Sequence, residues 1–203
     1  MSGLPAAERR KQLIAAAIRV ATAEGIDATT TRRVAKEAGV TVGVVHYCFG
    51  SKDHLFREVI KKIVNDLLQR AVDTLRPGSE LRDSLEQAAD AMWSAIEADP
   101  EAHLLTYELT TFTVRQPGFS DLGRWQYQCY FAAMKKFFIA VADLTSTTWV
   151  IPVATLARMM VNLNEGITLA WLVDRDSEQA RAVYSVFCDQ LVEMARPVRE
   201  PVA

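Results

Sequence analysis

The sequence predicts an all-α fold of about nine helices, and three observations support this class. Hydrophobic residues recur every three or four positions along most of the 203-residue chain, as they do on one face of an α-helix. Glycine, proline and capping residues interrupt that pattern at intervals of about one helix length. No stretch alternates apolar and polar residues between turn dipeptides, so no β-sheet is expected. We therefore expect a three-helix N-terminal domain over residues 1–62 and a helical C-terminal domain over residues 63–203.

Caps and stops divide the chain into its predicted helices. Thr30, Ser51 and Ser177 are expected N-caps, because their hydroxyls can accept from the exposed N–H groups of the first turn. The polar segment 145–148 is expected to be a loop, and the chain after Arg196 is expected to fray. The first four predicted helices cover 8–24, which Gly25 ends, then 31–38, then the segment from Val40 or Thr41 to Gly50, and then the segment from Ser51 to the stop at Pro77-Gly78. The other five cover 80–97, 101–115, 120–143, 152–173 and 177–195.

The charge of the chain is divided unevenly along its length. The net charge is −2, which taken alone argues against a nucleic-acid partner. Residues 1–62 carry 11 lysines and arginines against 6 aspartates and glutamates, or +5, while the remainder carries 12 against 19, or −7. A basic end on an acidic body indicates a nucleic-acid or membrane partner for that end alone.

Composition excludes several classes of protein. Three cysteines lie far apart, which is typical of reduced thiols in a cytoplasmic protein. The start of the chain has no apolar leader segment, and no apolar run reaches the ~18 residues of a membrane span. The three histidines lack metal-ligand spacing, and there is neither a glycine-rich phosphate loop nor a Glu-x-x-His pair. We therefore expect no enzyme activity, no metal and no cofactor. A redox role for Cys48 has little support, because Lys52 is the only evident cation near it.

Residues Thr30 to Val45 carry the pattern of a helix-turn-helix. Ala35 is small enough for two helices to cross closely, and Gly39 can adopt the left-handed turn conformation. The outer face of the second helix carries small residues near its N-terminus, followed by side chains that end in hydrogen-bonding groups. A helix that enters the major groove needs this arrangement. That face comprises Thr41, Val42, Gly43, His46 and Tyr47. Short helices joined at a glycine also occur in proteins that do not bind DNA, but the positive charge of the segment favours DNA.

Residues 9–62 resemble the N-terminal domain of the TetR family of bacterial transcriptional regulators. The resemblance rests on three runs, T-T-R-R-V-A-K-E-A-G-V, G-V-V-H-Y-C-F and G-S-K-D-H-L-F. The later helices are similar to the family only in number and length. The resemblance implies a regulator, expected to be a repressor, that binds a double-stranded DNA operator as a homodimer through the two helices over 152–173 and 177–195.

The resemblance also implies a set of DNA-binding residues. Arg32 stands where some members reach a base edge, and Lys52 stands at a helix N-terminus suited to a phosphate. The sequence departs from the family at Val42, where a polar or basic residue is frequent, and at Cys48, where histidine is frequent. The expected set is Thr30, Thr31, Arg32, Thr41, Val42, Gly43, His46, Tyr47 and Lys52.

The C-terminal domain contains aromatic residues and methionines at helical spacing, which form either a filled core or a partly hollow pocket. A pocket would bind an apolar or amphipathic small-molecule effector. With a filled core, the protein would be a ligand-independent or architectural DNA-binding regulator. The expected effector-binding residues are Trp93, Glu108, Phe112, Tyr127, Tyr130, Phe131, Met134, Met159 and Asn162.

Overall fold

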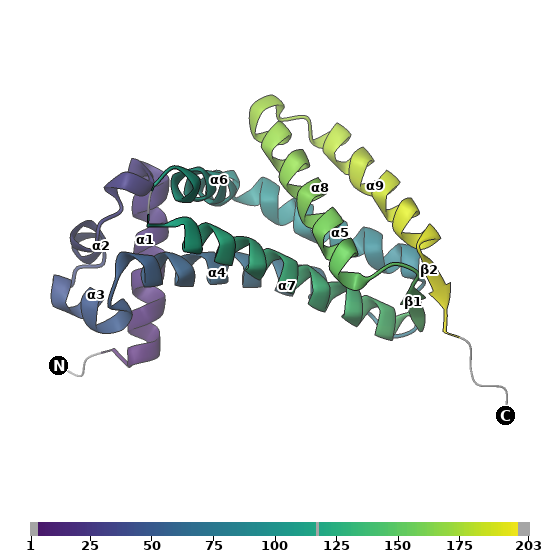
Figure 1. The fold of residues 1–203 in the computed structure, drawn as a ribbon, viewed down its shortest axis with the longest axis horizontal. Coiled ribbons are helices and arrows are strands. Elements are labelled where there is room, and N and C mark those ends of the chain that lie inside the picture. Colours follow the sequence, from purple (N-terminus) through teal and green to yellow (C-terminus); the bar gives the residue numbers. More distant parts are fainter. Residues whose placement is uncertain (1–3, 117, 199–203) are drawn as a thin grey trace. The chain divides into compact units, whose positions relative to one another are not determined.

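The computed structural model describes residues 4–116 and 118–198, and they form nine helices and two short strands (Figure 1). The all-α class predicted from the sequence is confirmed. The elements are α1 (Ala6–Ala28), α2 (Thr31–Glu37), α3 (Val42–Phe49), α4 (Lys52–Asp73), α5 (Leu81–Ala98), α6 (Pro100–Arg115), α7 (Ser120–Leu144), β1 (Thr147–Trp149), α8 (Val153–Asp174), α9 (Ser177–Glu193) and β2 (Ala195–Pro197).

The chain divides into two compact units. The first unit contains residues up to 63 together with 101–127, and the second contains 64–100 together with the residues from 128 onward. Helices α4 and α7 each contribute residues to both units. The first unit therefore includes α6 and the start of α7, which the sequence assigned to the C-terminal domain. The boundary between residues 62 and 63 as the limit of a DNA-binding domain stays a prediction.

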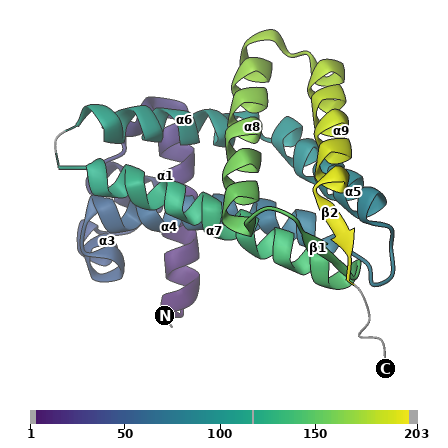
Figure 2. The same ribbon diagram turned by 45° about the vertical axis from the view of Figure 1, so that its right-hand side comes forward.

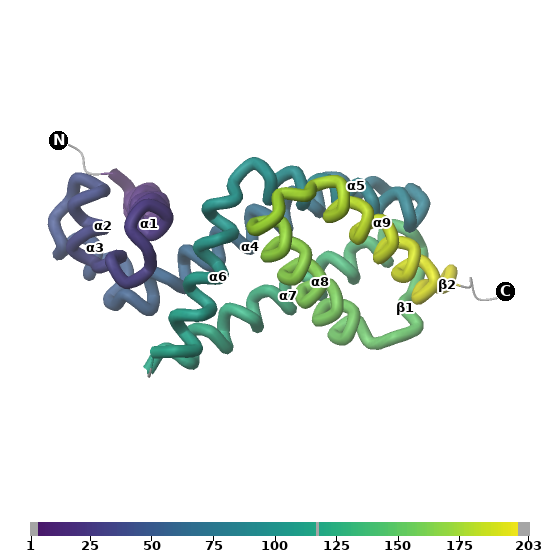
Figure 3. Tube along the Cα trace, turned by 90° about the horizontal axis from the view of Figure 1, so that it is seen from above, coloured from purple at the N-terminus to yellow at the C-terminus, as the bar shows by residue number. Residues whose placement is uncertain are grey.

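In the first unit, α1, α2 and α3 pack against one another at the N-terminal end of the chain (Figure 3). Their core is built from the apolar faces that the sequence pattern predicted, including Leu13, Ala17, Val34 and Val45, all at most 1% exposed. The predicted stop at Gly25 is confirmed, because its φ of 83° breaks the regular helix inside α1.

In the second unit, buried aromatic and aliphatic side chains of α5, α7, α8 and α9 form one hydrophobic core. Trp93 of α5 is fully buried in this core, with its ring 5.3 Å from Trp171 and 5.7 Å from Tyr184. Helices α8 and α9 lie side by side (Figure 2), with α5 packed against α9. Arg181 of α9 joins these elements by ion pairs to Asp90 and Glu97 of α5.

The expectation that no sheet forms is wrong. Strands β1 and β2 pair antiparallel, with Thr148 opposite Arg196, so the predicted loop at 145–148 and the predicted frayed end are partly ordered by each other. Trp149 anchors this ribbon, since its indole donates to the Phe138 carbonyl at 2.9 Å and its ring meets the edge of Phe138. Three-residue strands that lie nearly fifty residues apart are too short to produce an alternating sequence pattern.

One predicted cap is also wrong. Ser51 and Thr30 act as predicted, because they accept from the backbone N–H groups of His54 and Arg33. At α9 the N-cap is Asp176, whose carboxylate accepts from the Gln179 N–H at 2.9 Å. Ser177 is instead the first helical residue, and its hydroxyl accepts a hydrogen bond from the Trp171 indole.

Candidate functional site

Helix α3 is held in the first unit by one buried face. Val45, Cys48 and Phe49 are buried, and α3 packs against both α1 and α2. The turn before it forms at Gly39, whose φ of +66° is accessible to glycine without strain, and the Val40 N–H closes it on the Ala35 carbonyl. The opposite face of α3 is thereby fixed toward solvent.

The exposed face of α3 contains the residues that the sequence singled out. Thr41, Gly43, His46 and Tyr47 are exposed, and Val42 is half-buried. Tyr47 is 87% exposed, although a tyrosine ring is large and partly apolar. The helix therefore presents the aromatic ring of Tyr47 and its hydroxyl group to a partner.

The N-terminus of α2 carries two adjacent arginines with different surroundings. Thr30 caps the helix, Thr31 is half-buried and Arg32 is exposed. Arg32 forms no side-chain hydrogen bond or ion pair within the described parts of the chain. Arg33 is fully engaged, because it pairs with Glu24 at 2.6 Å and with Glu37 at 3.2 Å. Arg32 can thus reach an external partner, whereas Arg33 ties α2 to α1.

The pKa values of Arg33 and Glu37 are shifted by their ion pairs. The hydrogen bond with Glu24, followed by that with Glu37, raises the pKa of Arg33 above its ordinary value. Hydrogen bonds from Arg19 and then Arg33 lower the pKa of Glu37 below its ordinary value. The charged forms are stabilised in each case, since an opposite charge and a hydrogen bond both favour ionisation.

Lys52 begins α4 as expected, but its ammonium is already engaged. It donates to the Ile26 carbonyl at 3.1 Å and lies 5.1 Å and 5.5 Å from the ring centres of Phe56 and Phe112. Burial lowers the pKa of this amine, and the charge of Asp27 opposes the shift. A phosphate contact from Lys52 therefore requires the ammonium to leave or share that carbonyl.

Sequence reasoning missed the role of Arg10. Its guanidinium donates to the Cys48 carbonyl at the end of α3 and lies 4.8 Å from the centre of the Phe49 ring. Gln12, on the same helix, donates to the Ala38 carbonyl at 2.9 Å. Both contacts join residues at least 26 positions apart. No local sequence pattern could have indicated them.

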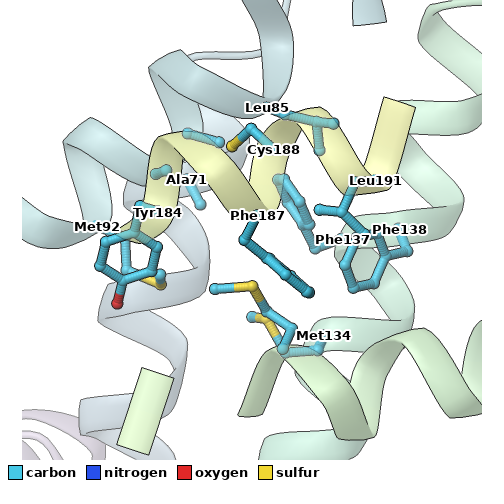
Figure 4. A pocket seen from close by; sticks show the side chains of 13 residues that line it. Ala71, Leu85, Met92, Met134, Phe137, Phe138, Tyr184, Phe187, Cys188 and Leu191 are labelled. Atoms are coloured by element: carbon cyan, nitrogen blue, oxygen red, sulfur yellow. The ribbon is translucent and has the colours of Figure 1, made fainter. Parts of the chain in front are cut away.

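The second unit contains an apolar cavity of about 30 Å³ (Figure 4). Its wall includes Met92 of α5, Met134 of α7 and Met160 of α8. Helix α9 contributes residues at a 3–4 spacing that the sequence had assigned only to dimerisation, namely Tyr184, Phe187, Cys188 and Leu191. Burial raises the pKa of the Cys188 thiol to about 11, so this group stays protonated and apolar at neutral pH.

The nine expected effector-binding residues do not meet at this cavity. Met134 lines it, while Trp93 and Met159 pack in the surrounding core. Tyr130, Phe131 and Asn162 belong to the second unit but not to the cavity wall, and Glu108, Phe112 and Tyr127 belong to the first unit. Asn162 is exposed on α8 rather than buried in an apolar stripe. Phe131 lies under the guanidinium of Arg158 at 5.0 Å.

The outer surface of α8 and α9 forms a groove of about 380 Å³. Its lining is mixed: Gly166, Ile167, Ala170 and Val183 contribute apolar surface, while Asn162, Asp174, Asp176 and Gln179 are polar or acidic. Nearby on the same two helices, Leu169, Val173 and Val186 are exposed although they are apolar. Exposed apolar side chains on two packed helices are typical of an association site.

Among residues 4–116 and 118–198, no three histidine, cysteine or acidic side chains gather as metal ligands. Within the same residues, no helix has the length and apolar character needed to cross a membrane.

Known proteins match this chain at two levels. The N-terminal model of the family described as bacterial regulatory proteins, tetR family, matches residues 13–59, from within α1 to within α4. The nicotine-responsive transcriptional repressor HdnoR of Paenarthrobacter nicotinovorans is 29% identical over 187 residues, which cover 92% of this chain and 93% of that protein.

Two further similarities are more limited. The transcriptional activator FasR of Mycolicibacterium smegmatis is 33% identical over 105 residues, and these cover 52% of this chain and 48% of FasR. The crystal structure of a transcriptional regulator from Rhodococcus sp. Rha1 has a TM-score of 0.68 at 20% identity. The matched region covers 95% of this chain and 99% of the chain of that regulator. At that identity the second similarity concerns the fold alone.

The two adjacent arginines provide a test of this geometry. Arg33→Ala should lower the melting temperature at neutral pH, because two ion pairs to α1 and within α2 are lost. The lowered pKa of Glu37 gives a stabilisation that is present above its ordinary value of 4.5 and is lost as the pH falls through the lowered value. The deficit of Arg33→Ala should therefore shrink in acid. Thermal unfolding followed by circular dichroism across this pH range measures both effects.

Arg32→Ala is the matched control, because Arg32 is exposed and neighbours Arg33 in the chain. Its melting temperature should equal that of the parent at every pH. Equal destabilisation by the two substitutions would contradict the different roles assigned to them.

Proposed function

Because the chain belongs to the TetR family of bacterial transcriptional regulators, we propose that it is a homodimeric repressor whose α3 reads operator DNA. The observation that carries this proposal is the two-sided character of α3. Val45, Cys48 and Phe49 anchor one face, while Tyr47 on the other is 87% exposed. An α-helix fits the major groove of B-DNA, where side-chain tips can reach base edges.

The proposed DNA contacts divide into two kinds. Arg32 reads a base edge. Its side chain is exposed near the N-terminus of α2 and has no partner within the described residues, so it is available to a base. The capping residue Thr30, its neighbour Thr31, and Tyr47 and Lys52 contact phosphates. Thr41, Val42, Gly43 and His46 complete the surface, with Val42 suited to a thymine methyl group. Lys52 makes its contact after releasing the Ile26 carbonyl, to which it donates at 3.1 Å.

Repression is favoured over activation by the extent of the similarities. HdnoR, named a repressor, matches along nearly the whole chain, whereas FasR, named an activator, matches along about half of it. A regulator acts where the chromosome is, so we place this protein in the bacterial cytoplasm. The protein represses transcription by occupying the operator.

The homodimer forms through α8 and α9. Their outer groove and the exposed Leu169, Val173 and Val186 supply an apolar surface on two helices that already pack together. A twofold dimer presents two copies of α3 to two half-sites about one DNA turn, or a multiple of a turn, apart. Two copies are needed because one short helix makes too few base contacts for high specificity.

An apolar or amphipathic small molecule releases the repressor in the proposed mechanism. Ala71 of α4 lines the methionine-rich cavity, and the same helix begins at Lys52 in the DNA-reading unit. A ligand that expands the cavity displaces α4, and α4 then moves α3. The ligand must bind the DNA-free state more tightly, since equal affinity for both states shifts no equilibrium. The nicotine response in the name of HdnoR supports a small effector.

A second candidate is a regulator that needs no effector. The cavity of about 30 Å³ has room for about one water molecule, while small-molecule sites usually occupy ~300–1,000 Å³. An effector site therefore requires the core to open. Met92, Met134 and Met160 favour such opening, because unbranched methionine side chains repack readily. If the core stays closed, the protein binds its operator independently of ligand.

The DNA contacts predict two distinct mutant phenotypes. Arg32→Ala should weaken operator binding by ~1–3 kcal/mol and relax the preference at one base pair, because a bidentate base contact is lost. Lys52→Met should weaken binding to all sequences about equally and reduce the salt slope by about one. Fluorescence anisotropy with an operator selected from a random DNA pool measures both.

Lys36→Ala is the control for Arg32→Ala, because Lys36 is also exposed on α2 but lies outside the proposed DNA surface. It should retain the parent's sequence preference. If Arg32→Ala and Lys52→Met both bind as the parent does, the assignment of these contacts is wrong.

The proposed interface predicts the mass of the protein in solution. The parent should be a dimer by light scattering at micromolar concentration. Val173→Glu combined with Val186→Glu should yield monomers, because the carboxylates would be buried against an apolar partner surface. Val114→Glu, at a valine on α6 that is 81% exposed, should remain a dimer. A monomeric parent, or dimers in the double variant, would refute this interface.

The effector mechanism predicts a coupled change in stability and DNA binding. Nicotine is the first probe, and saturating amounts should raise the melting temperature and release the operator. Met134→Trp should abolish both effects, because the larger side chain fills the cavity. Lys135→Trp places the same ring at the exposed neighbouring position and should keep both effects. If a panel of small apolar amines and acids changes neither quantity, the ligand-independent candidate is correct.

A further inference from the structure

The first unit contains a second hollow that no part of the proposed function uses. It is a cleft of about 400 Å³ between α1, the end of α3, the first three turns of α4, and the start of α7. This volume lies within the ~300–1,000 Å³ typical of small-molecule sites and is more than ten times that of the methionine-lined cavity. The cleft belongs to the DNA-reading unit rather than to the body.

Positive charge predominates among the side chains that line this cleft. Arg10, Arg57 and Lys61 face one carboxylate, Glu58. Glu58 pairs with Lys61 at 2.7 Å and lies 3.9 Å from Arg10, so a single carboxylate serves two cations. Arg57 pairs with Asp53 through Nε at 2.8 Å, which leaves the outer edge of its guanidinium for another acceptor. An added anion would complete the neutralisation of this cluster.

An indole ring positions two of these cations. The guanidinium carbon of Arg57 lies 4.9 Å, and the Lys61 ammonium 5.9 Å, from the centre of the Trp125 ring. A guanidinium that stacks on an aromatic ring keeps its N–H donors in one plane, where they match the two oxygens of a carboxylate. Less rotamer freedom is then lost when an anion binds.

The apolar part of the wall restricts the kind of anion. Phe49, Cys48 and Trp125 share the cleft with the cations, so a ligand that fills it has one charged end and one apolar face. We propose that this cleft binds a small aromatic carboxylate. The carboxylate pairs with Arg57 and Lys61, and the ring packs against the aromatic wall. This inference is independent of whether the body binds an effector.

The test uses the full-length protein and benzoate as the probe. The protein has four tryptophans, so the indole region of a ¹H–¹⁵N spectrum is simple, and Trp125→Phe identifies the Trp125 signal. Benzoate should shift that signal saturably in the millimolar range. Benzamide has nearly the same shape without the charge, and it should cause no saturable shift. Arg57→Gln and Lys61→Gln should each weaken benzoate binding about tenfold, as expected for loss of a charge-assisted contact.

Arg124→Gln is the matched control, because Arg124 precedes Trp125 on α7 but pairs outside the cleft with Asp121. It should bind benzoate as the parent does. Unchanged indole signals from Trp93, Trp149 and Trp171 will show that each variant is folded. Because two cation variants are measured, the proposal remains testable if one of them unfolds.

Several results would overturn the proposal. They are no saturable benzoate shift, equal binding of benzamide, parent-like binding by both cation variants, or an equal loss of binding in Arg124→Gln. DNA is the rival occupant. If benzoate causes no shift while Arg57→Gln weakens all DNA sequences and lowers the salt slope, the cleft is a phosphate contact and the proposal is wrong.

Discussion

The burial of one face of α3 is the constraint on which the rest of the first unit depends. Val45, Cys48 and Phe49 fix this helix against α1 and α2, and that packing orients the residues of α3 that belong to the proposed DNA surface. Two long-range contacts reinforce it, from Arg10 to the Cys48 carbonyl and from Gln12 to the Ala38 carbonyl. Loss of the buried face would remove the recognition surface together with the stability of the unit.

Helix α4 contributes to both proposed ligand sites. Helix α4 begins beside α3, follows the wall of the basic cleft and ends at the methionine-rich cavity. Both proposed ligand sites are therefore lined in part by one continuous helix. The cleft and the cavity differ in chemistry, since one is cationic and the other apolar, so they would respond to different molecules.

Local sequence patterns were sufficient for the helices and for the exposed face of α3. Gly25, Gly39, Thr30 and Ser51 act as predicted because a turn or a cap depends on residues within a few positions. The pairing of β1 with β2 was missed, because its signal lies in contacts between distant segments. The expected effector-binding set stays a prediction, and Met134 is its one member in the wall of the methionine-rich cavity. Helical spacing identifies an apolar face without indicating which other face it meets.

The sequence by itself determined the resemblance to the TetR family, the helical class and the position of the proposed DNA-reading helix, since these follow from a characteristic motif, local periodicity and turn chemistry. Only the tertiary structure decided which of two adjacent arginines is available and where the Lys52 ammonium points. Arg33 is committed to Glu24 and Glu37, and Lys52 to the Ile26 carbonyl. The availability of a charge depends on partners that folding brings from elsewhere in the chain, and residue type alone does not reveal them.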